Sequence, residues 1–219
     1  MNRPQSEEAT AFEAHKNVPP NWYELSVQTN LLQRFWHSRR IALLERVLLP
    51  VKGCALDVGC ADGFITSRIA DATGATQVVG IDFKEDSIVY ARNRYCERED
   101  LSFKVACAQN VPFGDSTFDA VTAIEVLEHV VDPVSVLSEV LRVLKRGGKL
   151  YIIVPTESIP FKLIWFAWTR FRGKVWQGTH ANKLSVDQLI VELQHLGYTN
   201  METHYFLLGM LVAIICCKR

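Results

Sequence analysis

The chain is expected to adopt an α/β fold, a doubly wound sheet that is mostly parallel and ends in an antiparallel C-terminal edge hairpin. Short apolar stretches alternate with amphipathic ones between residues 54 and 196, a pattern typical of βαβ units. The first apolar stretch ends in a turn that contains Gly59 and Gly63. The next one ends at Asp82, about 20 residues further on, which is the spacing of a nucleotide-binding βαβ unit.

The expected elements follow one another in a regular order. Residues 1–20 are predicted to be a flexible tail. Residues 21–50 are predicted to be a helical cap, because leucines such as Leu31 and Leu44 recur near the helical period and Pro50 stops the run. Strands are expected near 54–58, 78–82, 101–106, 118–124 and 149–154, with helices near 63–73, 85–96, 133–145 and 184–196.

The C-terminal part completes a Rossmann-like arrangement. Gly147 and Gly148 are predicted to end the helix near 133–145 and to start a strand. Residues 201–207 and 210–217 are predicted to form the edge hairpin. Because ligands of such sheets bind outside the carboxyl ends of the strands, four residues that directly follow strands should meet at one crevice: Asp57, Asp82, Cys107 and Glu125.

Composition narrows the classes of function. The 219 residues fit one domain, and 24 Lys plus Arg balance 24 Asp plus Glu, so no basic field indicates a nucleic-acid partner. The N-terminus is polar and acidic, unlike a signal peptide. The six cysteines form no C-x-x-C pair and are expected to be reduced, which predicts a cytoplasmic protein.

The glycine turn discriminates between cofactors. A dinucleotide site needs a third glycine to hold pyrophosphate, and Phe64 stands in its place. Asp57 and Asp62 bracket the turn and would repel phosphate, so a ligand with hydroxyls and positive charge is favoured. The turn resembles the D-x-G-x-G-x-G signature of class I S-adenosylmethionine-dependent methyltransferases, with Ala61 replacing the middle glycine.

Three further stretches carry the same resemblance. Residues 124–133 are similar to the family's E-V-L-E-H-V-x-D-P, and residues 142–148 to its R-V-L-K-P-G-G. Residues 105–121 resemble G-D-A-E-x-L-P-F-x-D-x-S-F-D, although Cys107 and Gln109 replace two acidic residues. The resemblance covers about residues 54–155. It implies an S-adenosylmethionine-dependent methyltransferase, formed by a single domain over residues 21–219.

The resemblance also implies roles for individual residues. Asp82 would accept hydrogen bonds from the ribose hydroxyls, Phe83 would face the adenine, and Arg34 would meet the methionine carboxylate. Helix capping by Asp82 is the alternative role. The full expected cofactor-binding set is Arg34, Asp57, Gly59, Ala61, Asp62, Gly63, Asp82, Phe83, Cys107, Ala108, Gln109 and Ile124.

His129 is the expected general base, since an imidazole near neutral pKa suits removal of a proton from an acceptor hydroxyl. Two alternatives stay open. Glu128 and His129 could only orient their loop, or Glu125, Glu128 and His129 could hold a divalent cation; no metal is included in the expected site. His180 is a second candidate base.

The segment after the fifth strand is rich in aromatic and basic residues, the composition of a helix in a membrane interface. Residues 156–183 are expected to form a lid, and two alternatives stay open: the aromatic residues are buried over the site, or residues 159–176 also make peripheral membrane contact. The insert and the following turn resemble ubiquinone-biosynthesis O-methyltransferases. That resemblance implies a polyprenyl phenol acceptor, membrane contact and a divalent cation at the Glu-Glu-His cluster.

The sequence therefore predicts methyl transfer from S-adenosylmethionine to oxygen or carbon of a small, apolar or lipid-like acceptor. The changes at Ala61 and Cys107 support one alternative, a non-catalytic module that binds S-adenosylmethionine. A nicotinamide oxidoreductase is the other alternative, and the missing third glycine opposes it. The sequence leaves the oligomeric state open.

Overall fold

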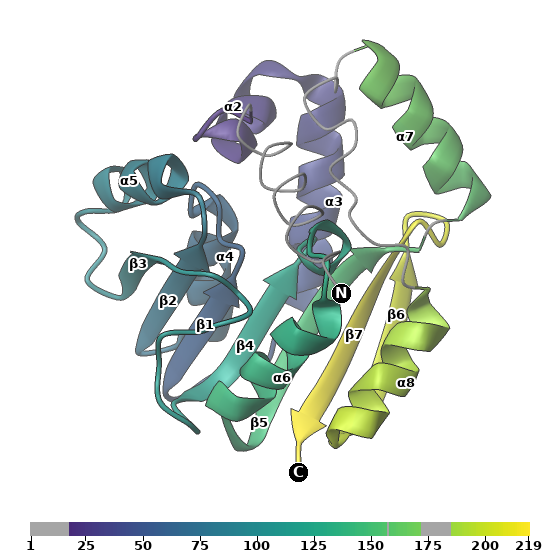
Figure 1. The fold of residues 1–219 in the computed structure, drawn as a ribbon. Coiled ribbons are helices and arrows are strands. Elements are labelled where there is room, and N and C mark those ends of the chain that lie inside the picture. Colours follow the sequence, from purple (N-terminus) through teal and green to yellow (C-terminus); the bar gives the residue numbers. More distant parts are fainter. Residues whose placement is uncertain (1–17, 157, 172–184) are drawn as a thin grey trace, which may run out of the picture.

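A seven-stranded sheet forms the centre of the molecule in the computed structural model, which describes residues 18–156, 158–171 and 185–219 (Figure 1). The strand order is β3-β2-β1-β4-β5-β7-β6. The five strands β1 to β5 pair in parallel, while β7 pairs antiparallel with both β5 and β6. The predicted fold class is therefore confirmed. The strands are β1 Cys54–Val58, β2 Gln77–Asp82, β3 Leu101–Val105, β4 Phe118–Ile124, β5 Leu144–Pro155, β6 Tyr198–Phe206 and β7 Leu211–Lys218.

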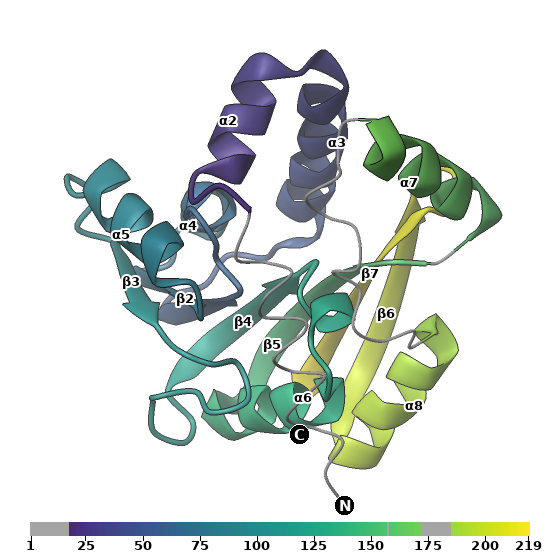
Figure 2. The ribbon, with the colours of Figure 1, turned by 45° about the horizontal axis from the view of Figure 1, so that its top comes forward.

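Helices cover both faces of the sheet (Figure 2). One apolar core packs α6 and α8 against one face, and a second core packs α3, α4 and α5 against the other. Neighbouring residues of β1 illustrate this division, because Ala55 belongs to the second core and Leu56 to the first. The helices are α2 Trp22–Thr29, α3 Leu31–Val47, α4 Phe64–Thr73, α5 Glu85–Arg94, the 3₁₀ helix η1 Leu127–His129, α6 Pro133–Val143, α7 Ile159–Phe171 and α8 Val186–Leu196.

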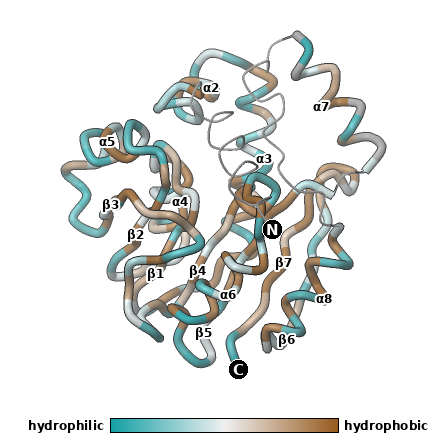
Figure 3. Tube along the Cα trace, in the orientation of Figure 1, coloured by the Kyte–Doolittle hydropathy of each residue, from teal (hydrophilic) through white to brown (hydrophobic). Residues whose placement is uncertain are grey.

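Strands that are buried on both faces need largely apolar sequence, and the central strands β1 and β4 have it apart from Asp57, Asp119 and Thr122. Figure 3 shows hydrophobic colour along the middle of the sheet, whereas the exposed turns of α5 are hydrophilic. β7 is buried over its first six residues, which explains why its sequence is apolar up to Lys218. β6 forms the outer edge beside it and is largely exposed.

The predicted helical cap consists of two helices rather than one run over 21–49. Asn30 has an extended backbone (φ −134°, ψ 113°) and separates α2 from α3. Its side chain accepts hydrogen bonds from the backbone N–H groups of Leu32 and Gln33, at 3.0 and 3.3 Å. An asparagine that caps a new helix in this way ends the preceding one. The hydrophobic period continues through this break, which is why the single run was predicted.

The predicted role of Gly147 and Gly148 as the end of a helix was wrong. α6 already ends at Val143, and both glycines lie inside β5, which begins at Leu144. Gly147 has a φ of +75° next to a shift in register between β4 and β5. A Cβ on Gly148 would lie 3.0 Å from the Asp119 carbonyl oxygen. The glycines therefore allow an irregular strand to approach its neighbour closely.

Candidate functional site

The carboxyl ends of the parallel strands lie at one edge of the sheet. In the strand register, Val58 of β1 is opposite Ile81 of β2 on one side and Ala123 of β4 on the other. Asp82 is opposite Val105 of β3. The ends of β1, β2 and β4 and the turns that follow them therefore lie at one edge, and together they carry most of the expected site residues.

The glycine turn after β1 is bent through residues with left-handed backbone. Gly59, Ala61 and Gly63 have φ angles of 72°, 46° and 77°. The N–H of Gly59 donates to the Ile81 carbonyl oxygen at 2.8 Å, which ties the turn to β2. A Cβ on Gly59 would lie 2.4 Å from a methyl group of Val126. Glycine is therefore needed there for space as well as for φ.

Asp82 lies at the end of β2 and organises the same turn. Its carboxylate accepts hydrogen bonds from the N–H of Ala61 at 3.0 Å and from the N–H of Lys84 at 2.8 Å. Asp82 is half-buried, and the neighbouring Phe83 is 41% exposed. An acceptor carboxylate beside an exposed aromatic ring has the chemistry that ribose hydroxyls and an adenine require.

Asp57 lies in the core rather than at the rim of the site. Its carboxylate accepts hydrogen bonds from the hydroxyls of Thr66 and Thr122, both at 2.7 Å. Burial raises the pKa of Asp57 to about 6, and the two threonine hydrogen bonds oppose that rise. Asp57 thus joins β1 to α4 and β4 below the turn.

Asp62 connects the turn to the N-terminal cap. Its carboxylate accepts hydrogen bonds from the N–H of Phe64 at 3.1 Å and from the N–H of Glu24 at 3.0 Å. Glu24 lies in the first turn of α2, whose own N-cap residue Asn21 makes no side-chain cap. The glycine turn therefore supplies the capping carboxylate of α2. Burial raises the pKa of Asp62 to about 6.

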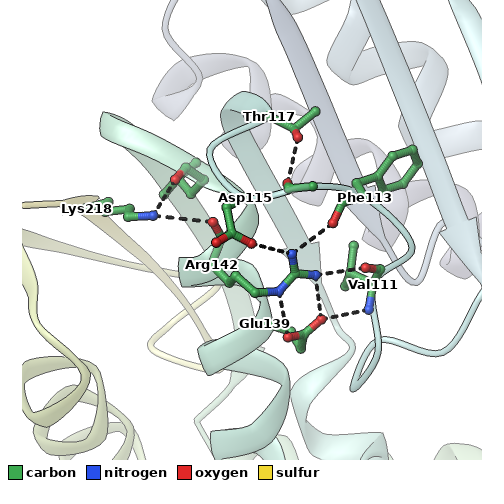
Figure 4. A network of polar contacts seen from close by, with 9 residues as sticks. Val111, Phe113, Asp115, Thr117, Glu139, Arg142 and Lys218 are labelled. Atoms are coloured by element: carbon green, nitrogen blue, oxygen red, sulfur yellow. Dashed lines mark hydrogen bonds and ion pairs between the residues drawn. The ribbon is translucent and has the colours of Figure 1, made fainter.

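The loop after β3 carries the residues expected near adenine. Cys107 is exposed, and its thiol lies 3.7 Å from the side-chain oxygen of Gln109. Ala108 and Gln109 are half-buried. Arg142 of α6 holds the next part of the loop, since its guanidinium bonds the carbonyl oxygens of Val111 and Phe113 (Figure 4).

The same guanidinium pairs with Asp115 and with Glu139 (Figure 4). Arg142 and Asp115 belong to two of the sequence stretches that carry the family resemblance. Their contact packs these two stretches on each other. Their part in the site is to fix the loop on which residues 107–109 lie.

The end of β4 brings the remaining expected residues to this edge. Ile124 is buried at the last position of the strand. Glu125 follows with an uncommon φ of +54°. His129 is half-buried at the end of η1, and its N–H donates to the Val126 carbonyl oxygen at 2.9 Å. His180 lies outside the described residues.

Arg34 and Arg40 lie on the same helix in different surroundings. Arg34 is exposed and its Nε donates to the Val27 carbonyl oxygen at 3.1 Å. Arg40 is 1% exposed and forms an ion pair with Glu125. Its position one turn before Leu43 places it on the buried stripe of α3, a signal that the sequence contained. Arg40 is thus a site residue that the sequence analysis missed.

His37 and Tyr23 were also missed, and both contact Arg40. His37 Nδ1 lies 2.9 Å from Arg40 Nη2, and the guanidinium carbon lies 5.2 Å from the centroid of the Tyr23 ring. Because a guanidinium only donates, Nδ1 accepts and the neutral imidazole carries its proton on Nε2, 3.2 Å from the Ser26 hydroxyl. Burial, helped by Arg40, lowers the pKa of His37 to about 2.

The described residues suit the cofactor that the resemblance implies better than they suit the divalent cation that it implies. Asp82, the open backbone of the glycine turn and Phe83 provide acceptors and an apolar face for an adenosine. Among the described residues, by contrast, no group of three His, Cys, Asp or Glu side chains could hold a metal ion. Glu125 pairs with Arg40 instead.

Comparisons with known proteins show which proteins this chain is similar to. Residues 56–152 match a family described as a methyltransferase domain. The chain is 27% identical to a demethylmenaquinone methyltransferase of Bacillus licheniformis, with 98% of this chain and 99% of the relative covered. It is also 27% identical to a ubiquinone biosynthesis O-methyltransferase of Hydrogenovibrio crunogenus, over 77% of this chain and 74% of the relative.

Four further quinone methyltransferases are matched over 49–56% of their own length, so the chain spans about half of each. Among solved structures, a methyltransferase from Aquifex aeolicus superposes with a TM-score of 0.65 at 18% identity. That match covers 94% of this chain and 97% of the other. It supports the fold alone.

Proposed function

We propose that this chain is an S-adenosylmethionine-dependent methyltransferase, whose residues 56–152 match a methyltransferase domain, and that it methylates an apolar, lipid-like phenol or quinol. The relatives named above act on quinone precursors, by their names, and this supports the acceptor class. The observation that carries the proposal is the aromatic helix α7. It stands beyond the end of the sheet to which the parallel strands run (Figures 1 and 2).

α7 carries a row of aromatic rings that contact one another. The Phe161 ring stacks on Trp165, with centroids 5.8 Å apart, and Trp165 lies 5.3 Å from Trp168. Phe161 is buried, and the two tryptophans are half-buried. These residues repeat at intervals of four and three, which is one face of a helix. Such a row of rings would suit a planar, apolar acceptor and would exclude water from it.

In this proposal Asp82 accepts hydrogen bonds from the ribose hydroxyls, and Phe83 lies against the adenine. Backbone groups of Gly59, Ala61 and Gly63 line the cofactor, while Ala108 and Gln109 border its base. The cofactor supplies a methyl group on a positively charged sulfur. The chain's part is to hold the two reactants in line and dry, an arrangement worth roughly 7–11 kcal/mol in favourable cases.

We also propose roles for the other residues expected to bind the cofactor. Ile124 would line the methionine portion at the end of β4. Arg34 would have to leave the Val27 carbonyl oxygen to meet the methionine carboxylate. Asp57 and Asp62 would act indirectly, by shaping the turn from below and by docking α2. Cys107 would contribute backbone rather than its thiol.

His129 is proposed as the general base that takes the proton of an acceptor hydroxyl. It follows β4 at the same edge as Asp82 and is half-buried, so that a substrate could reach the imidazole. Base catalysis of this kind contributes about 10²–10⁴-fold. Transfer to carbon of a quinol would use the same proton removal to raise electron density on the ring.

The acceptor class suggests that the enzyme works at a lipid surface. No helix in the described part of the chain is long and apolar enough to cross a bilayer. On α7, however, Ile164 and Phe166 are 51% and 67% exposed, and Lys162 and Arg170 are exposed beside them. Apolar and basic side chains together are typical of helices that lie in a membrane interface. We propose such peripheral contact through α7.

The test begins with donor binding measured by calorimetry. Asp82→Ala should weaken S-adenosylmethionine binding about tenfold or more, because it removes the ribose acceptor. Asp86→Ala changes an exposed carboxylate four residues later and should leave the affinity unchanged. Equal affinities of both variants and the wild type would contradict the proposed ribose contact.

Turnover then tests the acceptor. Methyl transfer to a prenylated quinol should have a higher kcat/KM than transfer to the same ring without its prenyl chain. His129→Ala should lower kcat by about 10²–10⁴-fold at unchanged donor affinity. An enzyme that binds the donor but methylates no quinol or phenol would refute the proposed acceptor class.

A further inference from the structure

The ion pair between Arg40 and Glu125 connects two distant parts of the chain at the site. Arg40 comes from α3 of the N-terminal cap, and Glu125 directly follows β4. The Arg40 side chain is 2% exposed and that of Glu125 is 18% exposed. A charge as deeply buried as this guanidinium is strongly destabilising without an opposite charge. Glu125 provides that charge.

Neighbouring groups fix the guanidinium in this place. His37 Nδ1 accepts from Nη2 at 2.9 Å, and the Tyr23 ring lies 5.2 Å away. His37 is in turn held by the Ser26 hydroxyl at 3.2 Å. All four residues belong to α2 and α3. The cap therefore positions one permanent positive charge against the end of β4.

The backbone of Glu125, the partner of Arg40, has an unfavourable conformation. Its φ of +54° is in the left-handed region, which costs a non-glycine residue about 1 kcal/mol or more. Its N–H is held by the Ile153 carbonyl oxygen at 2.7 Å. The backbone of Glu125 is thus fixed, and its carboxylate pairs with a guanidinium that is also fixed. A divalent cation at Glu125 would have to stand next to this guanidinium and would be repelled by it.

We propose that Arg40 supplies from within the chain the positive charge that a divalent cation would bring to Glu125. The enzyme therefore needs no metal ion at the segment from Glu125 to His129. This separates the chain from the Glu-Glu-His cation site that its sequence resemblance implied. Arg40 is a positioning residue, because it acts through Glu125 and through the docked cap.

Mn²⁺ binding, followed by electron paramagnetic resonance of the free ion, tests this without donor or acceptor. Mn²⁺ is a suitable probe because it is a paramagnetic divalent cation that binds carboxylate oxygens. The wild-type chain should bind no Mn²⁺ at this site. Arg40→Met keeps the apolar stem but removes the charge, and it should bind Mn²⁺ with a measurable affinity. A double variant, Arg40→Met with Glu125→Gln, should lose that binding.

Arg39→Met is the matched control, since Arg39 is the exposed neighbour on the same helix. It should behave as the wild type. Wild-type Mn²⁺ binding that disappears in Glu125→Gln would overturn the proposal. So would an Arg40→Met variant that has a native circular dichroism spectrum but binds no Mn²⁺.

A second measurement remains decisive if Arg40→Met does not fold. The wild-type affinity for S-adenosylmethionine should be the same within about twofold in a chelator and in millimolar Mg²⁺. A tenfold weaker affinity in the chelator would show that a bound cation supports the site, against the proposal. This outcome is independent of which acceptor the enzyme uses.

Discussion

Three aspartates at the first two strand ends show how neighbouring carboxylates take different roles. Asp57 is buried and accepts hydrogen bonds from two threonine hydroxyls, and Asp62 is buried and accepts hydrogen bonds from backbone N–H groups. Asp82 alone is half-buried at the rim of the turn. Of the three, Asp82 is best placed to meet a ligand. The other two bond to groups of the protein around the turn.

Asp57 should leave a signature in the pH dependence of stability. Its pKa is about 6 in the folded chain, against 3.8 for an ordinary aspartate. The folded state therefore holds this proton to higher pH than the unfolded state. The stability that it contributes is complete below pH 3.8 and is lost as the pH rises through 6.

Asp57→Asn removes this titration while keeping a side chain of the same shape. The free energy of unfolding of the variant relative to the wild type should rise between pH 4 and 6, by at most about 1.4 kcal/mol per pH unit. Urea unfolding at several pH values measures this difference. The free energy of unfolding of Asp187→Asn, at an exposed position on α8, should change with pH in the same way as that of the wild type. A parallel profile for Asp57→Asn would contradict the assigned pKa shift.

At the scale of elements, the glycine turn depends on both backbone angle and space. Gly59 and Gly74 both have left-handed backbone, with φ of 72° and 60°. A Cβ on Gly59 would meet Val126 at 2.4 Å, whereas a Cβ on Gly74 would have nothing within 4 Å. The two positions therefore separate steric crowding from conformational strain.

Gly74→Ala should cost about 1 kcal/mol of stability, from the strain alone. Gly59→Ala should cost about 2–4 kcal/mol, because Val126 or the turn must also shift. Thermal unfolding of both variants measures the difference. Adding Val126→Ala should recover part of the loss at Gly59 and none at Gly74. Equal losses of stability in the two variants would show that Val126 moves away from the new methyl group at no energetic cost.

The elements also show what the sequence could predict. Strands near 54–58 and 118–124 have the predicted bounds, because a parallel strand buried on both faces needs a largely apolar sequence, which both segments have apart from Asp57, Asp119 and Thr122. The break at Asn30 was missed because a cap inside an amphipathic run leaves the period intact. The start of β5 at Leu144 was missed because an irregular strand with glycines looks like a turn.

The site was less predictable than the fold for a physical reason. Residues that directly follow a strand were foreseeable, since the topology gathers them at one edge. Arg40 belongs to a helix that comes earlier in the chain, and only tertiary packing brings it to Glu125. A charged residue on the apolar stripe of a helix is the sequence signal for such a partner. The neighbouring sequence does not say which residue that partner is.

On the scale of the molecule, the cap and α7 lie at the same end, beyond the carboxyl ends of the parallel strands (Figures 1 and 2). α3 begins there with Leu31 and Leu32, which are 78% and 76% exposed, and Phe35 is 54% exposed. α3 has no acidic residue before Glu45, and α7 has none. Exposed apolar and basic side chains thus share the end at which the proposed acceptor would enter.

Liposome flotation tests whether this end contacts lipid. Vesicles of phosphatidylcholine with phosphatidylglycerol should carry the full chain, and high salt should weaken the binding by screening the basic residues. Phe166→Glu puts a negative charge on the exposed face of α7 and should reduce the floated fraction several-fold. The reduction follows from the loss of apolar contact together with repulsion from the anionic lipid.

Val191→Glu is the matched control, because Val191 is 44% exposed on α8, which packs on a face of the sheet rather than at this end. It makes the same chemical change and should float as the wild type does. If both variants float equally well, the surface of α7 does not hold the lipid. If neither they nor the wild type float, the acceptor must reach the site from solution. The aromatic row of α7 would then serve only to cover the reacting groups.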